Sequence, residues 1–264
     1  MPTSPGRRPD TWEGNSVSCG PWTPWPDLPI GPVVLVPTGS MEQHGPHLPL
    51  DTDTVIASAV ANGIAARIEG EVFVAPPIAY GASGEHEAFP GTVSQGSEAL
   101  AHMLLEVGRS LRHWALRYVF VNGHGGNVAA LETAVRRLQS EGDTAQWVPC
   151  AVPDADPHAG RTETSLMLHL MPERVRLGAA RPGNVAPLAE ILPELRARGV
   201  RAVSSSGVLG DPRGASPAAG EAILADMIDR AVRLITADGG PPGKNADPAR
   251  RVTGTDERSK TISD

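Results

Sequence analysis

Short apolar runs alternate with amphipathic stretches through the middle of the chain. The uninterrupted apolar runs are typical of buried strands and lie at 33–36, 72–75, 118–121 and 145–152. Apolar residues recur at helical spacing over 54–68, 97–114, 127–138, 163–170 and 217–237. Thr54 is the expected N-cap of the first helix. Strands that are each followed by a helix predict an α/β fold, with a mostly parallel sheet and helices on both faces.

The two ends of the chain lack this pattern. Residues 1–28 are rich in Pro, Gly, Ser and Trp, which predicts an irregular N-terminal arm or one docked by Trp12, Trp22 and Trp25. Residues 239–264 contain almost no large apolar side chain, so we expect a disordered C-terminal tail. The intervening stretch, 29–238, is interpreted as the folded domain.

Composition and charge exclude several classes of partner. The 264 residues are 40% hydrophobic, which is enough for a substantial core. The net charge is −7 and no basic stripe is present, so nothing indicates nucleic-acid binding. No apolar run approaches the roughly 20 residues of a membrane helix. We therefore expect a cytoplasmic protein with no membrane partner, in which Cys19 and Cys150 are reduced thiols.

Two polar motifs directly follow predicted strands. TGSMEQHGPH occupies 38–47 after the first strand, and NGHGGN occupies 122–127 after the third. Ligands of open parallel sheets bind outside the carboxyl ends of the strands. The two motifs are therefore expected to converge at one sheet edge, although about 80 residues separate them in the chain.

The residue types in these motifs suit a divalent metal, because carboxylate oxygen and imidazole nitrogen bind Zn²⁺, Mn²⁺ and Fe²⁺. Glu42 and His44 are two positions apart, so an extended backbone directs both side chains the same way. Asp53 is able to bridge two ions, one on each oxygen. Glycines around His124 allow a sharp turn and a close approach to a ligand. The combination predicts a metal site.

Each residue also has a structural interpretation. Asp53 or Asp51 alternatively caps the nearby helix, and Asn127 alternatively caps the helix that follows it. Glu163 lies five residues after His158 at the start of another predicted helix. It is interpreted as a ligand or a proton carrier, and alternatively as a complement to the helix dipole.

Other chemistries receive less support. Ser40 and Ser165 do not lie in G-x-S-x-G, which disfavours a serine hydrolase. A non-catalytic protein that keeps its metal as a scaffold is a further alternative. Glu85, His86 and Glu87 lie in a Gly-rich loop, where they either line a substrate entrance or form a solvated surface.

Four stretches, at 35–53, 121–127, 158–172 and 207–216, resemble the creatininase family of metal-dependent amidohydrolases. The resemblance implies a three-layer α/β/α fold and a site for two divalent ions, zinc or iron, with manganese as a further possibility. Glu42, Asp53 and His124 match the ligands of one ion. His44 and the bridging Asp53 match ligands of the other ion.

The resemblance departs from the family pattern at one position. Creatinine-cleaving members carry a Glu two residues after the His of the third-strand loop, whereas this chain has Gly126. The difference argues against creatinine as the substrate. We expect Glu163 to complete the second ion instead, and His158 matches a catalytic histidine of the family.

The likeness continues through 75–94 to family members that act on a small modified precursor peptide. It implies a homo-oligomer built from dimers that hydrolyses an amide bond near the peptide C-terminus and releases a Val-Tyr-derived product. Hydrolysis of a small cyclic amide or a formamide is the alternative within the family.

Overall fold

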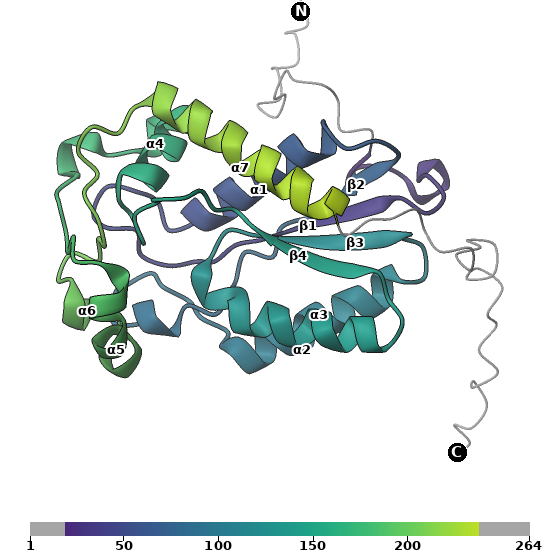
Figure 1. The fold of residues 1–264 in the computed structure, drawn as a ribbon, viewed down its shortest axis with the longest axis horizontal. Helices are drawn as coiled ribbons and strands as arrows, with labels where there is room; N and C mark the ends of the chain where they lie inside the picture. The colour runs from purple at the N-terminus through teal and green to yellow at the C-terminus, as the bar shows by residue number, and fades with distance from the viewer. Residues whose placement is uncertain (1–18, 238–264) are drawn as a thin grey trace, which may run out of the picture.

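The computed structural model describes residues 19–237, which form a four-stranded sheet between layers of helices (Figure 1). The strands are β1 (Val33–Thr38), β2 (Val72–Val74), β3 (Arg117–Asn122) and β4 (Ala145–Pro149). Their order is β2-β1-β3-β4, and every pairing is parallel. The prediction of a mostly parallel α/β sheet is therefore confirmed.

Alternate residues of the strands build two separate cores. Val34, Val36 and Phe120 face one side of the sheet and pack against α2 (Ser97–Leu111) and α3 (Val128–Ser140). Leu35 and Val119 face the other side. That face is covered by α1 (Thr52–Ala65), α4 (Arg161–Leu170) and α7 (Pro217–Ala237). Apolar residues on both faces of each strand explain the uninterrupted runs, and the three-layer α/β/α architecture is confirmed (Figure 1).

Helix boundaries differ from the prediction at several points. The first helix begins at Thr52, so the prediction of Thr54 as its N-cap is wrong. The Thr54 hydroxyl instead donates a hydrogen bond to the carbonyl oxygen of Ser40 at 3.1 Å. The second helix ends at Leu111 and not at Trp114. These shifts of a few residues leave the order of the elements unchanged.

Two helices between α4 and α7 were not predicted. They are α5 (Leu188–Arg198) and α6 (Val200–Val203), which lie together at one end of the molecule (Figure 1). Helix α5 contains Pro193 and buries only Ile191, so it lacks the apolar stripe that identifies a helix in a sequence. Short 3₁₀ turns occupy Trp25–Asp27, Gly84–His86, Gly125–Asn127, Pro172–Arg174 and Leu177–Ala179.

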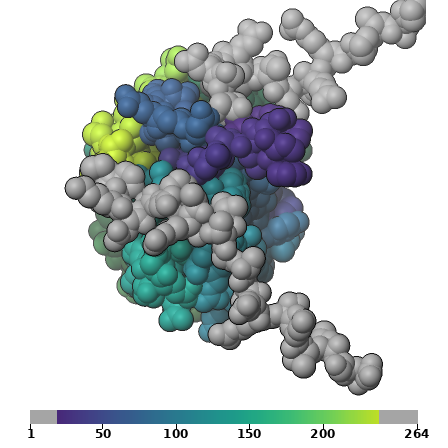
Figure 2. Space-filling model, turned by 90° about the vertical axis from the view of Figure 1, so that its right-hand side faces the viewer, coloured from purple at the N-terminus to yellow at the C-terminus, as the bar shows by residue number. Residues whose placement is uncertain are grey.

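The predicted arm is described only from residue 19 onward, and the predicted tail at 239–264 lies outside the described residues. Cys19 is buried, and its thiol donates to the carbonyl oxygen of Val72 at 3.3 Å. The segment that follows lies on the surface (purple in Figure 2), and both Trp22 and Trp25 are exposed. Docking of the arm by these two tryptophans is therefore not observed. Cys150 is a free thiol, in line with the expected reduced state. Between residues 19 and 237 there is no helix of sufficient length and hydropathy to cross a membrane.

Candidate metal centre

Two glycines allow α1 to approach the carboxyl ends of β1 and β3. A Cβ atom at Gly39 would collide with the backbone of Thr54, and one at Gly123 would collide with the carbonyl oxygen of Asp53. The close packing places Asp53, in the first turn of α1, at the sheet edge where the two polar motifs begin. The predicted convergence of the motifs is confirmed.

The side-chain amide of Asn127 joins three of the surrounding loops. Its Nδ2 donates to the carbonyl oxygen of Gly39 at 2.9 Å, and its Oδ1 accepts from the N–H of Ala82 at 2.9 Å. Asn127 does occupy the N-cap position of α3, but its side chain makes no capping hydrogen bond. Its observed role is to hold loops from different strands together, and the interpretation as a simple helix cap is wrong.

Asp53 presents one carboxylate oxygen to each of two histidines. Its Oδ1 lies 3.1 Å from Nε2 of His44, and its Oδ2 lies 3.2 Å from Nδ1 of His124. The hydroxyl of Ser40 also donates to Oδ2, at 2.6 Å. Asp51, not Asp53, occupies the N-cap position of α1, and it makes no side-chain capping hydrogen bond, so the alternative of Asp53 as the helix cap is wrong. An aspartate with separate partners on its two oxygens is suited to bridge two cations.

The orientation of His44 leaves one ring nitrogen free to bind a metal. Its Nδ1 donates to the backbone oxygen of Glu42 at 3.1 Å, which directs Nε2 toward Oδ1 of Asp53. Oε2 of Glu163 is 3.8 Å from the same Nε2 and accepts a hydrogen bond from the N–H of Ala159 at 2.6 Å. Glu163 therefore lies beside His44, with its carboxylate facing the same ring nitrogen as Asp53.

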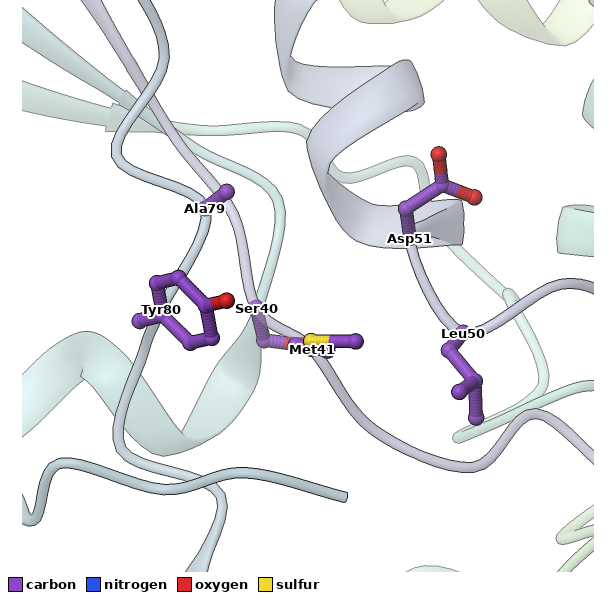
Figure 3. A pocket seen from close by; sticks show the side chains of 6 residues that line it. All are labelled: Ser40, Met41, Leu50, Asp51, Ala79 and Tyr80. Carbon is purple, nitrogen blue, oxygen red and sulfur yellow. The ribbon is translucent and has the colours of Figure 1, made fainter. Parts of the chain in front are cut away.

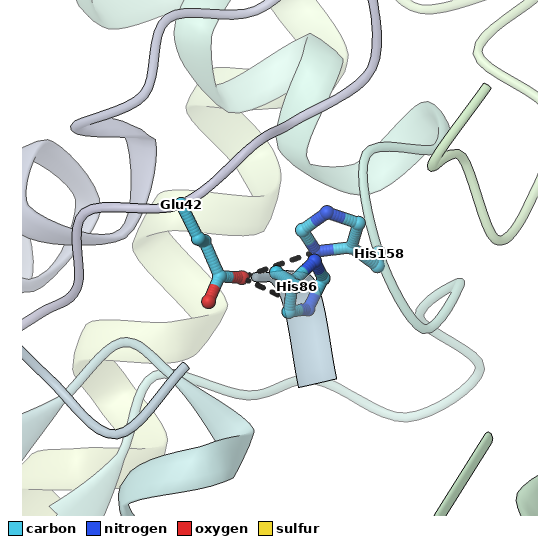
Figure 4. A group of neighbouring side chains, drawn as sticks. All are labelled: Glu42, His86 and His158. Atoms are coloured by element: carbon cyan, nitrogen blue, oxygen red, sulfur yellow. Dashed lines mark ion pairs between the residues drawn. The ribbon is translucent and has the colours of Figure 1, made fainter. Parts of the chain in front are cut away.

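Glu42 is a fully buried carboxylate surrounded by imidazoles (Figure 4). The three nearest nitrogens are Nε2 of His124 at 3.2 Å, Nε2 of His86 at 3.4 Å and Nδ1 of His158 at 3.6 Å. Neither Glu42 oxygen accepts a hydrogen bond of normal geometry from the described residues. Burial raises the pKa of Glu42 to about 7, although the nearby His124 opposes the shift. A buried carboxylate without such bonds is costly unless a cation neutralises it.

His86 and Gln43 are members of the site that the sequence did not reveal. His86 is buried within the cluster and does not line its entrance. Oε1 of Gln43 accepts from the N–H of Gly45 at 2.9 Å, which orients the amide so that Nε2 donates to Nδ1 of His86 at 2.8 Å. In the sequence, the only indication of this contact is that both segments are rich in potential metal ligands and amide side chains.

His158 enters the cluster from the loop before α4, as predicted. Its Nε2 lies 2.8 Å from the backbone oxygen of Gln43 and 3.0 Å from the side-chain nitrogen of the same residue, and its Nδ1 lies 3.6 Å from Oε1 of Glu42. Burial, together with the positive charge of His44, holds the pKa of His158 well below its usual value. His158 is therefore neutral near pH 7.

The charges of His44 and His124 depend on the acids around them. Burial by itself would lower both pKa values, but the surrounding carboxylates outweigh it and raise each to about 10. The principal acid is Asp53 for His44 and Glu42 for His124. Both imidazoles are therefore protonated and positively charged. Their charges balance the carboxylates that divalent ions would also balance.

Three overlapping groups of donor atoms within the described residues have the spacing of metal ligands, with atoms within 4.8 Å of one another. The groups are Glu42 with His44 and Asp53, His44 with His158 and Glu163, and Glu42 with His86 and His158. Mixed nitrogen and oxygen donors are typical of zinc, manganese and iron sites. The structure therefore brings Glu42, His44, Asp53, His124, His158 and Glu163 into one cluster.

An apolar pocket of about 330 Å³ lies beside the first motif (Figure 3). It is lined by Ser40, Met41, Leu50, Asp51, Ala79 and Tyr80. None of the cluster side chains contributes to its lining, although Ser40 is hydrogen-bonded to Asp53.

Comparison with known proteins matches the whole folded region to one family. The model of the creatininase family, described as creatinine amidohydrolase, matches residues 25–235. A mycofactocin precursor peptide peptidase from Mycolicibacterium smegmatis is 59% identical over 202 residues, which are 75% of this chain and 82% of that protein.

Solved structures of creatininases are also similar. A mutant creatininase described as the Zn-Zn type is 29% identical, with a TM-score of 0.63 over 80% of this chain and 92% of that one. A structure described as creatininase Mn is 29% identical, with a TM-score of 0.64 and the same coverage. The fold and the family therefore agree with the resemblance found in the motifs.

Proposed function

This chain belongs to the creatininase family, and we propose that it is a metal-dependent peptidase that acts on the mycofactocin precursor peptide. In this proposal, cleavage occurs near the C-terminus of the modified peptide and releases a Val-Tyr-derived product. The observation that carries the proposal is the 59% identity to a peptidase with this substrate in its name, combined with a buried cluster of metal-ligand side chains.

The donor set fits two divalent ions, zinc or iron, with manganese as a further candidate. Glu42, Asp53 and His124 would hold one ion, and His44, Asp53 and Glu163 would hold the other. Support comes from the two Asp53 oxygens, which face different histidines, and from the buried Glu42 carboxylate. When bound, such ions activate water near neutral pH and polarise the scissile carbonyl.

His158 is the proposed proton carrier of the reaction. Its neutral ring accepts a proton at Nδ1, the nitrogen that faces the cluster, because Nε2 is committed to the backbone oxygen of Gln43. The protonated ring then donates from Nδ1 to the amine that leaves the cleaved amide. Gln43 holds the tautomer on which both steps depend.

A small-molecule amidohydrolase, acting on a cyclic amide or a formamide, is the second candidate. Its support is the similarity to structures described as creatininases. The peptide substrate is favoured because the sequence identity to the peptidase is 59%, whereas the identity to these structures is 29%. A scaffold that keeps the metal without turnover is a third candidate, which any measurable turnover eliminates.

Incubation of the purified protein with the modified precursor peptide tests the proposal directly. Mass spectrometry is expected to show a shortened peptide and a released Val-Tyr-derived fragment, and a chelator should abolish both. Creatinine, a cyclic amide and a formamide are assayed in parallel at the same enzyme concentration. Intact peptide together with rapid turnover of one small amide would favour the second candidate.

A further inference from the structure

The Glu85 carboxylate lies near one of the two ring nitrogens of His124. Oε1 of Glu85 is 3.8 Å from Nε2 of His124, which also lies 3.2 Å from Oε2 of Glu42, whereas Nδ1 faces Asp53 at 3.2 Å. The same Nε2 donates to the carbonyl oxygen of Ala82 at 3.1 Å, which directs Nδ1 toward Asp53. The Glu85 side chain is 28% exposed, so its charge reaches His124 at the boundary between the buried cluster and solvent.

Gly126 provides the space for this arrangement. A Cβ atom at this position would collide with the carbonyl oxygen of Ala82 and with Nε2 of His124, and it would lie 2.8 Å from Oε1 of Glu85. The loop that carries Ala82 and Glu85 therefore occupies the volume that any side chain at position 126 would need. Position 126 carries no carboxylate, but the Glu85 carboxylate, which belongs to a different loop, lies close to it.

Packing against α5 and α6 holds the Glu85 loop in place. Gly199, at φ +77°, leaves room for the carbonyl oxygen of Glu85, which would lie 2.8 Å from a Cβ atom there. Arg201 donates to the carbonyl oxygen of Ala88 at 2.9 Å and lies over the ring of Phe89, 5.3 Å from its centre. Phe89 in turn packs against a small apolar cluster formed by Ile191, Val200 and Leu209. The position of Glu85 is thus set by tertiary contacts.

We propose that Glu85 is a positioning residue of the metal centre, acting on a bound ion through Nε2 of His124, alongside the closer Glu42 carboxylate. The inference rests on the metal centre proposed above. A carboxylate near the N–H of a metal-binding imidazole stabilises that tautomer and makes the other ring nitrogen more basic, which strengthens its bond to the metal. Changes to such outer partners typically weaken metal binding by about 10–100-fold. Because Glu85 is partly exposed and is not within hydrogen-bond distance, we expect the lower end of this range.

Titration of the metal-free full chain with Zn²⁺, read by competition with a chromogenic chelator, tests the role without an activity assay. Wild type is expected to bind two ions. Glu85→Gln should still bind two, with one of them weakened about tenfold. Glu85→Asp keeps the charge and should recover part of the affinity. Glu87→Gln removes an exposed acid from the same loop and should match wild type.

The outcomes separate this inference from the proposed function. Superimposable titration curves for wild type and Glu85→Gln, with equal melting temperatures, would overturn the role of Glu85 and leave the metal centre intact. Complete loss of one ion in Glu85→Gln would make Glu85 a direct ligand and overturn its action through His124. A wild-type protein that binds no divalent ion would overturn the metal centre, and the role of Glu85 with it.

Discussion

Asp53 is the residue on which both halves of the cluster depend. Its two oxygens have different partners, and its position is set by the contact between α1 and the glycines that follow β1 and β3. Burial would by itself raise the pKa of Asp53, but His44 and His124 hold it well below its usual value. The carboxylate is therefore ionised near neutral pH.

Asp53→Ala should remove bound metal and activity together, because a shared ligand of both ions disappears. Turnover is expected to fall by more than about 100-fold, since even the loss of outer partners costs up to that much. Elemental analysis of the purified variant and the peptide assay measure the two effects. Asp51→Ala is the matched control, because Asp51 is exposed and pairs with Arg174 at the surface. Normal metal content with normal turnover would contradict the bridging assignment.

Glu163→Gln separates two roles for that carboxylate. The amide preserves the shape of the side chain and its bond to the N–H of Ala159 but lacks the negative charge that a cation requires. We expect the ion beside His44 to be weakened selectively, as seen in a metal titration with two distinguishable steps. Glu173→Gln, which changes an exposed acid just after α4, serves as the control. Retention of both ions with loss of turnover would identify Glu163 as a proton carrier.

At the scale of elements, α2 and α3 are joined by a network of charges near their C-terminal ends. Glu141 receives hydrogen bonds from Arg109 at 2.5 Å, from Arg112 at 2.7 Å and from Arg137 at 2.8 Å. Arg112 also contacts Asp143 at 2.7 Å. The contacts hold the two helices together on the face of the sheet opposite α7.

The Arg109 and Arg112 side chains hold the pKa of Glu141 far below its ordinary value of 4.5. A lowered folded-state pKa contributes stability above the unfolded pKa, and this contribution is lost as the pH falls. Glu141→Gln should therefore melt below wild type at pH 7, and the difference should shrink as the pH falls below about 4.5. Thermal melts between pH 3 and 7 measure this. Glu132→Gln, which removes an exposed partner of Arg136, should behave like wild type throughout. A pH-independent difference would show that shape, and not charge, stabilises the contact.

For the whole molecule, the described part of the arm leaves apolar side chains on the surface. Trp22 is 72% exposed, Trp25 is 83% exposed and Ile30 is also exposed. Large exposed apolar side chains grouped in one segment are typical of interaction surfaces. We expect the partner to be a second copy of the chain, because most soluble oligomers are symmetric homo-oligomers and dimers are the commonest of them.

Light scattering at micromolar concentration is expected to give a mass above that of one chain. Replacement of Trp22 and Trp25 by Ser should weaken the association and lower the measured mass, because the apolar contact is lost. Val185→Ser is a control, since Val185 is also exposed but lies outside the arm. A monomeric mass for wild type would reject the homo-oligomer.

The local sequence pattern by itself determined a large part of the fold of this protein. Apolar runs and helical spacing identified the four strands and five of the helices that pack on them, since burial of one or both faces leaves a periodic trace in the sequence. The sheet edge also followed from sequence, because the carboxyl ends of parallel strands coincide. Glu42, His44, Asp53 and His124 were therefore predicted to meet, and they do.

Only the tertiary structure decided which loops complete the cluster. His86 and Glu85 arrive from a turn about 40 residues before His124, and their place is set by contacts with Gly199 and Arg201. Helix α5 carries no apolar stripe, so neither the helix nor the loop it supports had a local signal. Likewise, the local sequence does not show that Ala82, His124 and Glu85 fill the space beside Gly126. Periodicity records the burial of a face, whereas contacts between distant loops depend on how the faces pack.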